Sequence, residues 1–257
     1  MTTVDDHVLA RDLAREAGRR LLELRATGGP DSGPDVLRKA GDRQSHEYLV
    51  AELARERPGD HVLSEEAADD PARLSADRVW IVDPLDGTRE FGEGNRTDWA
   101  VHVALWERRE GLVAGAVSLP AQGETLSTAT PPPHPPAPAD AGPLRVVVSR
   151  TRAPEFVNRL GLDIVPLGSA GAKVAAVVLG DADAYIHAGG FYEWDTAAPV
   201  AVARAAGYHA SRLDGSELRY NQADLLVPDI LVCHPGYADV LLQAIEAALF
   251  EEGRHAS

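Results

Sequence analysis

The sequence is poor in several residue types, and each scarcity narrows the class of protein. Among its 257 residues there is a single cysteine, Cys233, so an intramolecular disulfide and a disulfide-stapled scaffold are excluded. Because Cys233 lies in the apolar run DILVC, we interpret it as a buried small hydrophobic residue rather than a reactive thiol. Lysine occurs only as Lys39 and Lys173 among 25 basic residues, so each retained ammonium group is of interest.

Positive charge and long hydrophobic runs are scarce too. The 40 acidic residues outnumber the 25 basic ones, and the formal charge of −15 argues against binding nucleic acid through a basic face. No apolar stretch reaches the ~18 residues that a membrane span needs, and the first residues lack a secretory-signal pattern. We therefore expect a cytoplasmic protein without nucleic-acid or membrane partners.

Apolar periodicity predicts two helices followed by strands in the first half of the chain. The expected helices cover 5–25 and about 43–57, and the expected strands cover 61–66 and 79–82. The segments WAVHVALWE and GLVAGAVSL, joined by a charged turn, predict a hairpin.

A proline-rich loop at residues 131–143 separates this half from one in which strands and helices alternate. Strands are expected at 144–150, 163–168, 182–187 and 229–233, and helices at 154–160, 169–180, from 194 onward and at 236–249. The predicted fold class is α+β leading into α/β, with an N-terminal half at 1–130 and a C-terminal half at 144–257.

The most informative stretch is WIVDPLDGT, in which a strand-like apolar run ends in Asp83 and Asp86. Pro84 cannot continue a sheet ladder, so a turn is expected to direct both carboxylates and the Leu85 carbonyl into one space. Gly87 permits close backbone approach, and Thr88 begins a segment whose free amides can receive an anion. The alternative is a tight turn with aspartate caps.

Two further motifs place acids at element ends. SEE supplies Glu65 and Glu66 at the end of a strand, and EWDTAAP supplies Asp195 where a helix begins. Taken singly, the first could be a solvated acidic loop and the second a helix N-cap. Together, hard oxygen ligands without histidine or cysteine select Mg²⁺, with two ions roughly 4 Å apart able to clamp a phosphate.

WIVDPLDGT, preceded by SEE and followed by WDTAA, resembles the Mg²⁺-dependent, lithium-sensitive phosphatases of the inositol monophosphatase superfamily over nearly the whole chain. The resemblance implies a layered α-β-α-β-α sandwich of the inositol monophosphatase/fructose bisphosphatase type, and suggests a homodimer. Three later segments, GSAGAKVAAVVLGDADAYIH, EWDTAAPVAVARAAG and SRLDGSELRYNQ, resemble an actinobacterial subset of the CysQ type. That type removes the 3′-phosphate of 3′-phosphoadenosine 5′-phosphate (PAP) in sulfur metabolism; inositol phosphates and fructose 1,6-bisphosphate are the alternative substrates.

The resemblance also assigns roles to residues. It implies one metal on Glu65, Asp83 and the Leu85 carbonyl, and a second on Asp83, Asp86 and Asp195, with Asp86 essential for turnover. Glu66 and Thr88 would orient the attacking water, and the amides around Gly87 and Thr88 would hold the phosphate.

The resemblance also bears on the substrate site and on a third metal. Ser169 and Lys173 fit a segment that lines the nucleotide site, although Lys173 could instead extend to solvent. Asp42, in the short segment LRKAGDRQSHE that lacks the usual threonine, fits a third, weaker metal ligand or a surface turn. His187 replaces a substrate-contacting residue of another type or is a surface histidine at a strand end. Tyr192 or Phe191 could stack on a purine or pack in the core.

The expected reaction is in-line attack of water on phosphorus, without a phosphoenzyme. One rival is a haloacid-dehalogenase-type phosphatase, but its two aspartates are separated by one residue, whereas Pro84 and Leu85 both separate Asp83 from Asp86. Another rival is a non-catalytic nucleotide or metal sensor; the presence of Glu66 and Thr88 argues against it.

Overall fold

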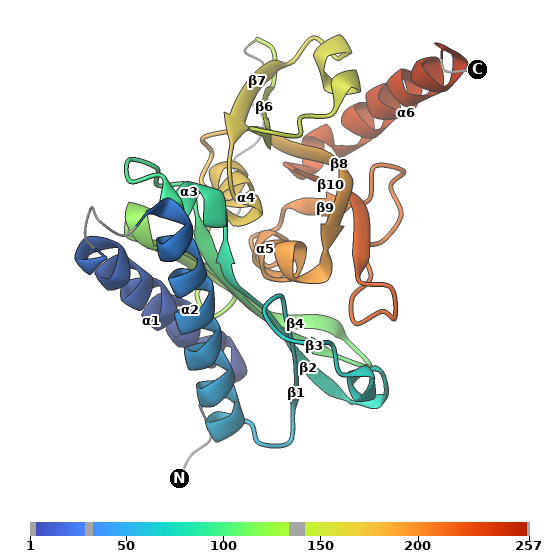
Figure 1. Ribbon diagram of the computed structural model, residues 1–257. Helices are drawn as coiled ribbons and strands as arrows, with labels where there is room; N and C mark the ends of the chain where they lie inside the picture. The colour runs from blue at the N-terminus through green and yellow to red at the C-terminus, as the bar shows by residue number, and fades with distance from the viewer. Residues whose placement is uncertain (1–3, 29–32, 134–141, 256–257) are drawn as a thin grey trace.

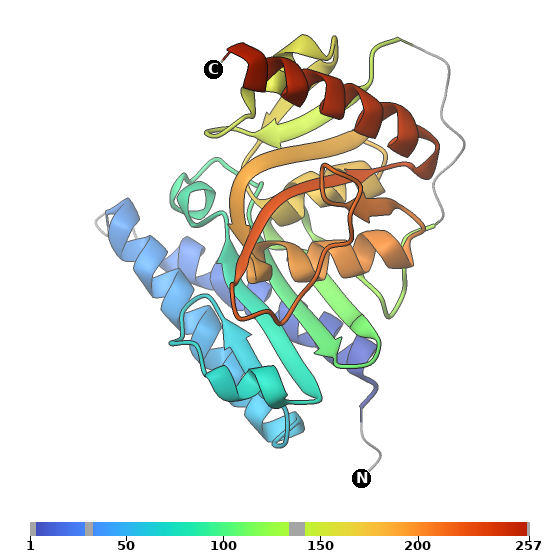
Figure 2. The same cartoon turned by 90° about the vertical axis from the view of Figure 1, so that its right-hand side faces the viewer.

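The structure, a computed structural model, describes residues 4–28, 33–133 and 142–255 and arranges them in five alternating layers (Figure 1). The layers are α1 (Asp6–Thr27) with α2 (Pro34–Glu56), a first sheet, α4 (Ala170–Val178) with α5 (Glu193–Ala205), a second sheet, and α6 (Ala238–His255) (Figure 2). This order confirms the predicted α-β-α-β-α sandwich.

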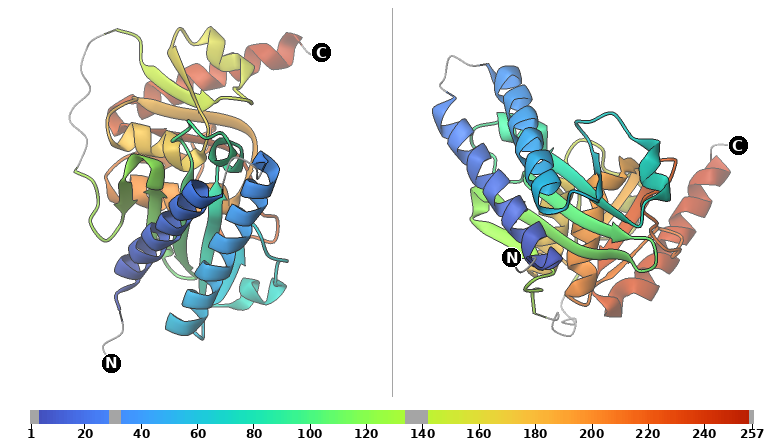
Figure 3. Two further views of the ribbon diagram at one scale, coloured as in Figure 1. Left: turned by 60° about the vertical axis from the view of Figure 1, so that its left-hand side comes forward. Right: turned by 90° about the horizontal axis from the view of Figure 1, so that it is seen from below.

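The first sheet has the strand order β1-β2-β3-β4-β5, with β1 and β2 parallel and the other neighbours antiparallel. Its strands are β1 (His61–Ser64), β2 (Arg78–Asp86), β3 (Ala100–Glu107), β4 (Gly111–Leu119) and β5 (Glu124–Ser127). Short helical turns follow some of them: η1 (Pro71–Ser75), α3 (Thr88–Gly92) and η2 (Pro120–Gln122). Helices α1 and α2 cover one face (Figure 3), because the leucines and alanines of α1 recur at 3–4 spacing and are buried.

The second sheet has the order β7-β6-β8-β10-β9, with β7, β6 and β8 parallel and β10 antiparallel to both of its neighbours. Its elements are β6 (Arg145–Ser149), η3 (Glu155–Arg159), β7 (Asp163–Leu167), β8 (Ala184–Tyr192), β9 (His209–Ser211), β10 (Leu226–Cys233) and η4 (Pro235–Tyr237). Helix α6 covers the outer face, where Leu241 and Ile245 join a core with Val146 and Ile186. Helices α4 and α5 fill the space between the two sheets.

Two further predictions concern Cys233 and the proline-rich loop. Cys233 is buried and unbridged, as predicted. Most of the predicted proline-rich loop, residues 134–141, lies outside the described residues. None of the helices in the described part of the chain combines the length and the apolar composition needed to cross a bilayer.

The predicted start of the second helix was wrong. Helix α2 begins at Pro34 rather than near residue 43, because Gly33 ends the preceding loop and Pro34 occupies the first helical turn, where its missing N–H costs nothing. Asp42 therefore lies within a helix, and the surface-turn interpretation of this residue is wrong.

Strand lengths differed from prediction for local reasons. β2 continues to Asp86 instead of stopping near residue 82, because its pairing with β3 skips Pro84 and Leu85 in a bulge and resumes at Asp86. β8 likewise continues past His187 to Tyr192. Two short strands, β5 and β9, were missed, and the helix expected at 154–160 is the 3₁₀ segment η3.

Candidate metal and phosphate site

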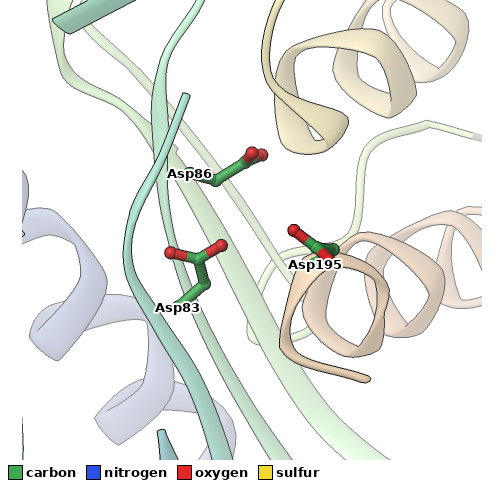
Figure 4. Close-up of side chains that lie close together, drawn as sticks. All are labelled: Asp83, Asp86 and Asp195. Atoms are coloured by element: carbon green, nitrogen blue, oxygen red, sulfur yellow. The ribbon is translucent and has the colours of Figure 1, made fainter. Parts of the chain in front are cut away.

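Three aspartates from distant parts of the chain meet in a cleft between the two sheets. Asp83 and Asp86 lie at the end of β2, and Asp195 lies in the first turn of α5 (Figure 4). Each offers a carboxylate oxygen, and these oxygens all lie within 4.8 Å of one another. Glu65 directly follows β1, whose Ser64 pairs in parallel with Val82, so it emerges beside Asp83.

The bulge at the end of β2 directs both aspartates to the same side. The Pro84 carbonyl accepts a hydrogen bond from Ser45 Oγ at 2.6 Å, and the Leu85 N–H donates to Asp83 Oδ1 at 3.0 Å. Gly87 then adopts φ +83°, and a Cβ there would lie 3.1 Å from the Ser169 side chain. Glycine is therefore required for the chain to pass this close to the cleft.

Asp86 has one carboxylate oxygen fully engaged by the protein. Its Oδ2 accepts hydrogen bonds from Ser169 Oγ at 2.5 Å and from the Gly171 N–H at 2.8 Å. The Oδ1 atom has no such protein donors among the described residues, so it is the oxygen left for a cation. Ser169, predicted to line a nucleotide site, thus contacts Asp86 and caps α4 through the Ala172 N–H.

Sequence reasoning missed His102, whose ring is completely buried on β3 beside Asp86. Nε2 lies 3.1 Å from Asp86 Oδ2, an ion-pair distance with poor hydrogen-bond alignment, and Nδ1 lies 3.2 Å from the Trp194 carbonyl oxygen. A carbonyl only accepts hydrogen bonds, so Nδ1 is the donor to Trp194, whereas Nε2 has no aligned partner. The sequence feature that could have indicated a role for this residue is a histidine within the otherwise apolar strand WAVHVALWE.

Asp195 both caps the N-terminus of α5 and belongs to the aspartate cluster. Its Oδ2 accepts the Tyr192 N–H at 2.7 Å as the third residue of α5. The helix-cap alternative is therefore partly right, with Tyr192 rather than Asp195 at the N-cap position. A carboxylate has a second oxygen, so capping leaves room for a cation.

The cluster carries more negative charge than the protein compensates. Burial, followed by the charges of Glu65 and Asp86, raises the pKa of Asp83 well above its usual range. Burial and the Asp86 charge raise the pKa of Asp195 to about 6. Glu65 reaches solvent at the rim, but desolvation on its cleft side and the charge of Asp195 raise its pKa to about 7.

Asp86 behaves in the opposite way. Burial alone would raise its pKa, but the charge of His102 and the hydrogen-bond donors around it hold the pKa below the usual range. Asp86 is thus the ionised member of the cluster, and Asp83 the one that most needs a cation or a proton.

Thr88 links the end of β2 to α2. Its hydroxyl lies 3.0 Å from the Leu85 carbonyl oxygen and 3.2 Å from Asp42 Oδ1. Burial and the nearby charge of Glu66 raise the pKa of Asp42 to about 6. The structure therefore brings Asp42, Glu66 and Thr88 to one edge of the cluster.

A cleft of about 310 Å³ opens over the cluster. Its lining residues include Asp86, Gly87, Thr88, Arg89, Glu90, Ser149, Arg150, Thr151, Arg152, Gly168, Ser169, Ala170, Lys173, Phe191 and Asp195. A larger groove of about 520 Å³ lies between α4 and the loop at residues 95–98, and it includes none of the clustered aspartates. The smaller cleft is therefore where the chemistry can take place.

Lys173 and Arg152 add positive charge to the lining of this cleft. Lys173 is 2% exposed and donates to the Ser169 carbonyl at 2.9 Å and to the Gly168 carbonyl, so the solvent-extended alternative is wrong. Arg152, which sequence reasoning missed, is exposed in the cleft, and its guanidinium has no ion-pair partner in the described part of the chain.

The structure does not bring His187 to the cleft surface, and it is not a surface histidine either. The ring is completely buried, stacks on Phe191 at 3.8 Å between centroids, and leaves both nitrogens without a hydrogen-bond partner. Burial and the charges of Lys173 and Arg152 lower its pKa to about 3, so the ring is neutral. Tyr192 is half exposed and stacks on Trp194.

The donor set fits magnesium. Among the described residues, the group that could hold a metal ion consists of carboxylates alone. Mg²⁺ prefers such hard oxygen ligands. The raised pKa values of Asp83, Asp195 and Glu65 show an uncompensated charge that a divalent cation would relieve.

Without a divalent cation, we expect Glu65 and Asp195 to make the free energy of unfolding fall as pH rises from about 5 to about 8. In this range the folded chain holds protons that the unfolded carboxyls have already released, because the folded pKa values are about 7 and about 6. Mg²⁺ replaces these protons, so it should raise the melting temperature more at about pH 8 than at about pH 5.

Thermal unfolding with and without Mg²⁺ at both pH values checks this prediction. The difference between paired scans removes contributions from other groups, such as the buried His187. A magnesium-induced shift that is the same at both pH values would contradict the charge assignment.

Comparison with known proteins places this site in a family. The chain matches the inositol monophosphatase family over residues 7–249, and it therefore belongs to that family. This confirms the resemblance drawn from WIVDPLDGT, SEE and WDTAA, and it removes the haloacid-dehalogenase alternative.

Among its relatives is the 3′-phosphoadenosine 5′-phosphate phosphatase of Mycobacterium leprae, 52% identical over 259 residues that cover 93% of each chain. The 3′(2′),5′-bisphosphate nucleotidase CysQ of Escherichia coli O157:H7 is 32% identical over 81% of this chain and 91% of its own. The crystal structure of CysQ from Bacteroides thetaiotaomicron superposes with a TM-score of 0.70 at 30% identity, covering 89% of this chain and 97% of that one.

Proposed function

We propose that this chain is a Mg²⁺-dependent phosphatase that hydrolyses the 3′-phosphate of PAP to give AMP and inorganic phosphate. The observation that carries the proposal is the convergence of Asp83, Asp86 and Asp195 within 4.8 Å. The choice of PAP is supported by the names of the mycobacterial and CysQ relatives. A cleft lined by carboxylates and by the exposed Arg152 guanidinium suits a substrate with two phosphates, one for the bound cations and one for the arginine.

The proposed metal ligands are the Glu65, Asp83, Asp86 and Asp195 carboxylates with the Leu85 carbonyl, and Asp42 for a weaker third ion. When bound, two or three Mg²⁺ ions would neutralise these acids, polarise the phosphate and make water a better nucleophile. Asp86 would bind through Oδ1, because its Oδ2 is engaged by Ser169 and Gly171.

The chain's own residues position the reacting groups. Gly87 and Thr88 line the cleft, and we assign their amides to the phosphate oxygens. Glu66 and Thr88 orient the water, which attacks phosphorus in line with the ribose oxygen while that P–O bond breaks. The Thr88 hydroxyl already lies within 3.2 Å of Asp42, so the water would join an existing network.

The test is phosphate release by the purified chain with PAP, inositol 1-phosphate and fructose 1,6-bisphosphate, with Mg²⁺ and with a chelator. We expect kcat/KM for PAP to exceed the others by about tenfold or more, and all activity to vanish with the chelator. Preference for another ester would replace the substrate assignment. Background release from all three would favour the non-catalytic sensor.

Arg152 offers a sharper prediction about specificity. Arg152→Gln should lower kcat/KM for PAP about tenfold, or about 1.4 kcal/mol, because an exposed cation in the cleft would lose its contact with the 5′-phosphate. The matched substrate is 3′-AMP, which lacks the 5′-phosphate, and kcat/KM for it should stay within about twofold. Equal losses on both substrates would contradict this role.

A further inference from the structure

The buried side chain of Arg73 joins two segments that lie far apart in the sequence. Arg73 is 1% exposed, although it belongs to η1 in the otherwise exposed loop between β1 and β2. Its Nε and Nη2 atoms donate to the two oxygens of Asp69 at 2.6 and 3.0 Å. Nη1 donates to Asn221 Oδ1 at 2.7 Å, and Nη2 also donates to the Gln222 carbonyl at 2.9 Å. Such a planar, multiply bonded guanidinium cannot be reproduced by a lysine ammonium.

Asn221 and Gln222 extend this junction to the start of α5. Their backbone N–H groups donate to the two carboxylate oxygens of buried Glu193 at 2.6 and 2.7 Å. The Asn221 side chain also donates back to the Arg73 carbonyl at 3.1 Å. Asn221 has a φ of +57°, the only positive φ of a non-glycine residue in the described chain. The strained backbone of Asn221 therefore lies where its segment contacts Arg73.

Both ends of the junction lie next to proposed metal ligands. Asp69 follows Glu65 by four residues on the same loop, and Glu193 precedes Asp195 by two residues on α5. Residues 65–72 are all exposed, so core packing does not fix this loop. Instead, the ion pair between Arg73 and Asp69 holds the loop in place.

Electrostatics make such an anchor necessary. The loop carries four acids, Glu65, Glu66, Asp69 and Asp70, and its Glu65 faces the aspartate cluster. Like charges at these separations repel by about 1 to several kcal/mol near a protein surface. Before a cation binds, this repulsion opposes the approach of the loop to Asp195.

We propose that Arg73 is a positioning residue for metal binding: through Asn221 and Glu193 it holds the loop with Glu65 against the helix with Asp195. The inference rests on the proposed metal site and adds a residue that contacts neither substrate nor metal. Its role is to keep two halves of one cation site together while the site is empty and self-repulsive.

The experiment is a calorimetric titration of Mg²⁺ into the metal-free chain and its variants, with activity measured across Mg²⁺ concentrations. In Arg73→Lys the Kd for Mg²⁺ should rise about tenfold, while kcat at saturating Mg²⁺ stays within about threefold of the unsubstituted chain. Asn221→Gly, which suits the positive φ but removes the amide, should raise the Kd in the same direction.

Arg57→Lys is the matched control. Arg57 is 9% exposed at its side chain and pairs with Asp6 at 2.6 Å, but it contacts neither the loop nor α5. Its Kd for Mg²⁺ should stay within about twofold. An unchanged Kd in both Arg73→Lys and Asn221→Gly, with only a lower melting temperature, would overturn the inference. If Arg73→Lys does not fold, Asn221→Gly decides; an unsubstituted chain that binds no Mg²⁺ would overturn the proposed function itself.

Discussion

Asp83→Asn is expected to abolish turnover and yet to stabilise the metal-free protein. Loss of a charge that both proposed metals share should reduce kcat by at least about 10³-fold, or about 4 kcal/mol. The folded chain should become more stable at about pH 8, since the pKa of Asp83 is raised well above its usual range and each pKa unit corresponds to about 1.4 kcal/mol. The variant can keep the acceptor for the Leu85 N–H.

Asp86→Asn is the matched comparison, and its stability should move the other way. Asp86 is the first of several carboxylates whose charge offsets Lys173, which is 2% exposed, and its Oδ2 accepts from Ser169 and Gly171. Neutralising it reduces the negative charge that offsets Lys173 and weakens two hydrogen bonds to a charged acceptor, which are worth about 1.5–3 kcal/mol each. Turnover should be lost in both variants. Chemical denaturation without metal checks the sign, and equal stability changes for the two would contradict the charge assignment.

His102→Leu is expected to lower kcat/KM about 100-fold, or about 2.7 kcal/mol, together with a loss of stability. The ring stands between Asp86 Oδ2 and the Trp194 carbonyl, one residue before Asp195. Leucine fills similar space but can neither donate to the Trp194 carbonyl nor place a polar nitrogen beside Asp86 Oδ2, so the orientation of the Asp86 carboxylate and the start of α5 would both relax. The measurement is steady-state kinetics over a range of Mg²⁺ concentrations.

His102→Asn controls for the loss of hydrogen bonding as opposed to shape. Asparagine keeps an N–H donor but is shorter than histidine, so its activity should fall between those of the leucine variant and the unsubstituted chain. A leucine variant with unchanged kcat/KM would mean that Ser169 and Gly171 alone hold the Asp86 carboxylate in place.

The parts of the site that could be predicted from the sequence are those set by strand ends. Asp83 and Asp86 follow an apolar run, Glu65 follows another, and parallel pairing of β1 with β2 brings their carboxyl ends to one edge. The start of α5 could be predicted as well, because Asp195 lies in the first turn of a clear helical pattern. The site was therefore largely encoded in local patterns and in the order of motifs.

What could not be predicted depends on contacts between remote segments. The sequence shows His102 only as one polar residue in an apolar strand, and its neighbours Trp194 and Asp86 become evident only in the folded chain. Arg73 reads as a surface arginine in an acidic loop, because the loop with Asn221 lies 148 residues away in the chain. The early start of α2 was missed because a polar run with Gly41 lacks a clear apolar stripe, although Gly41 is buried against Phe91 and Leu85.

The buried thiol of Cys233 makes site-specific labelling of this protein simple. Burial raises its pKa to about 12, and its side chain is completely enclosed, so alkylating reagents at neutral pH find neither a thiolate nor a path to it. A chain carrying Ala68→Cys in the exposed acidic loop would thus offer one reactive sulfur without removal of the native one. The emission of a fluorophore attached there could be compared with and without Mg²⁺, as a measure of whether the surroundings of the loop change when the cation binds.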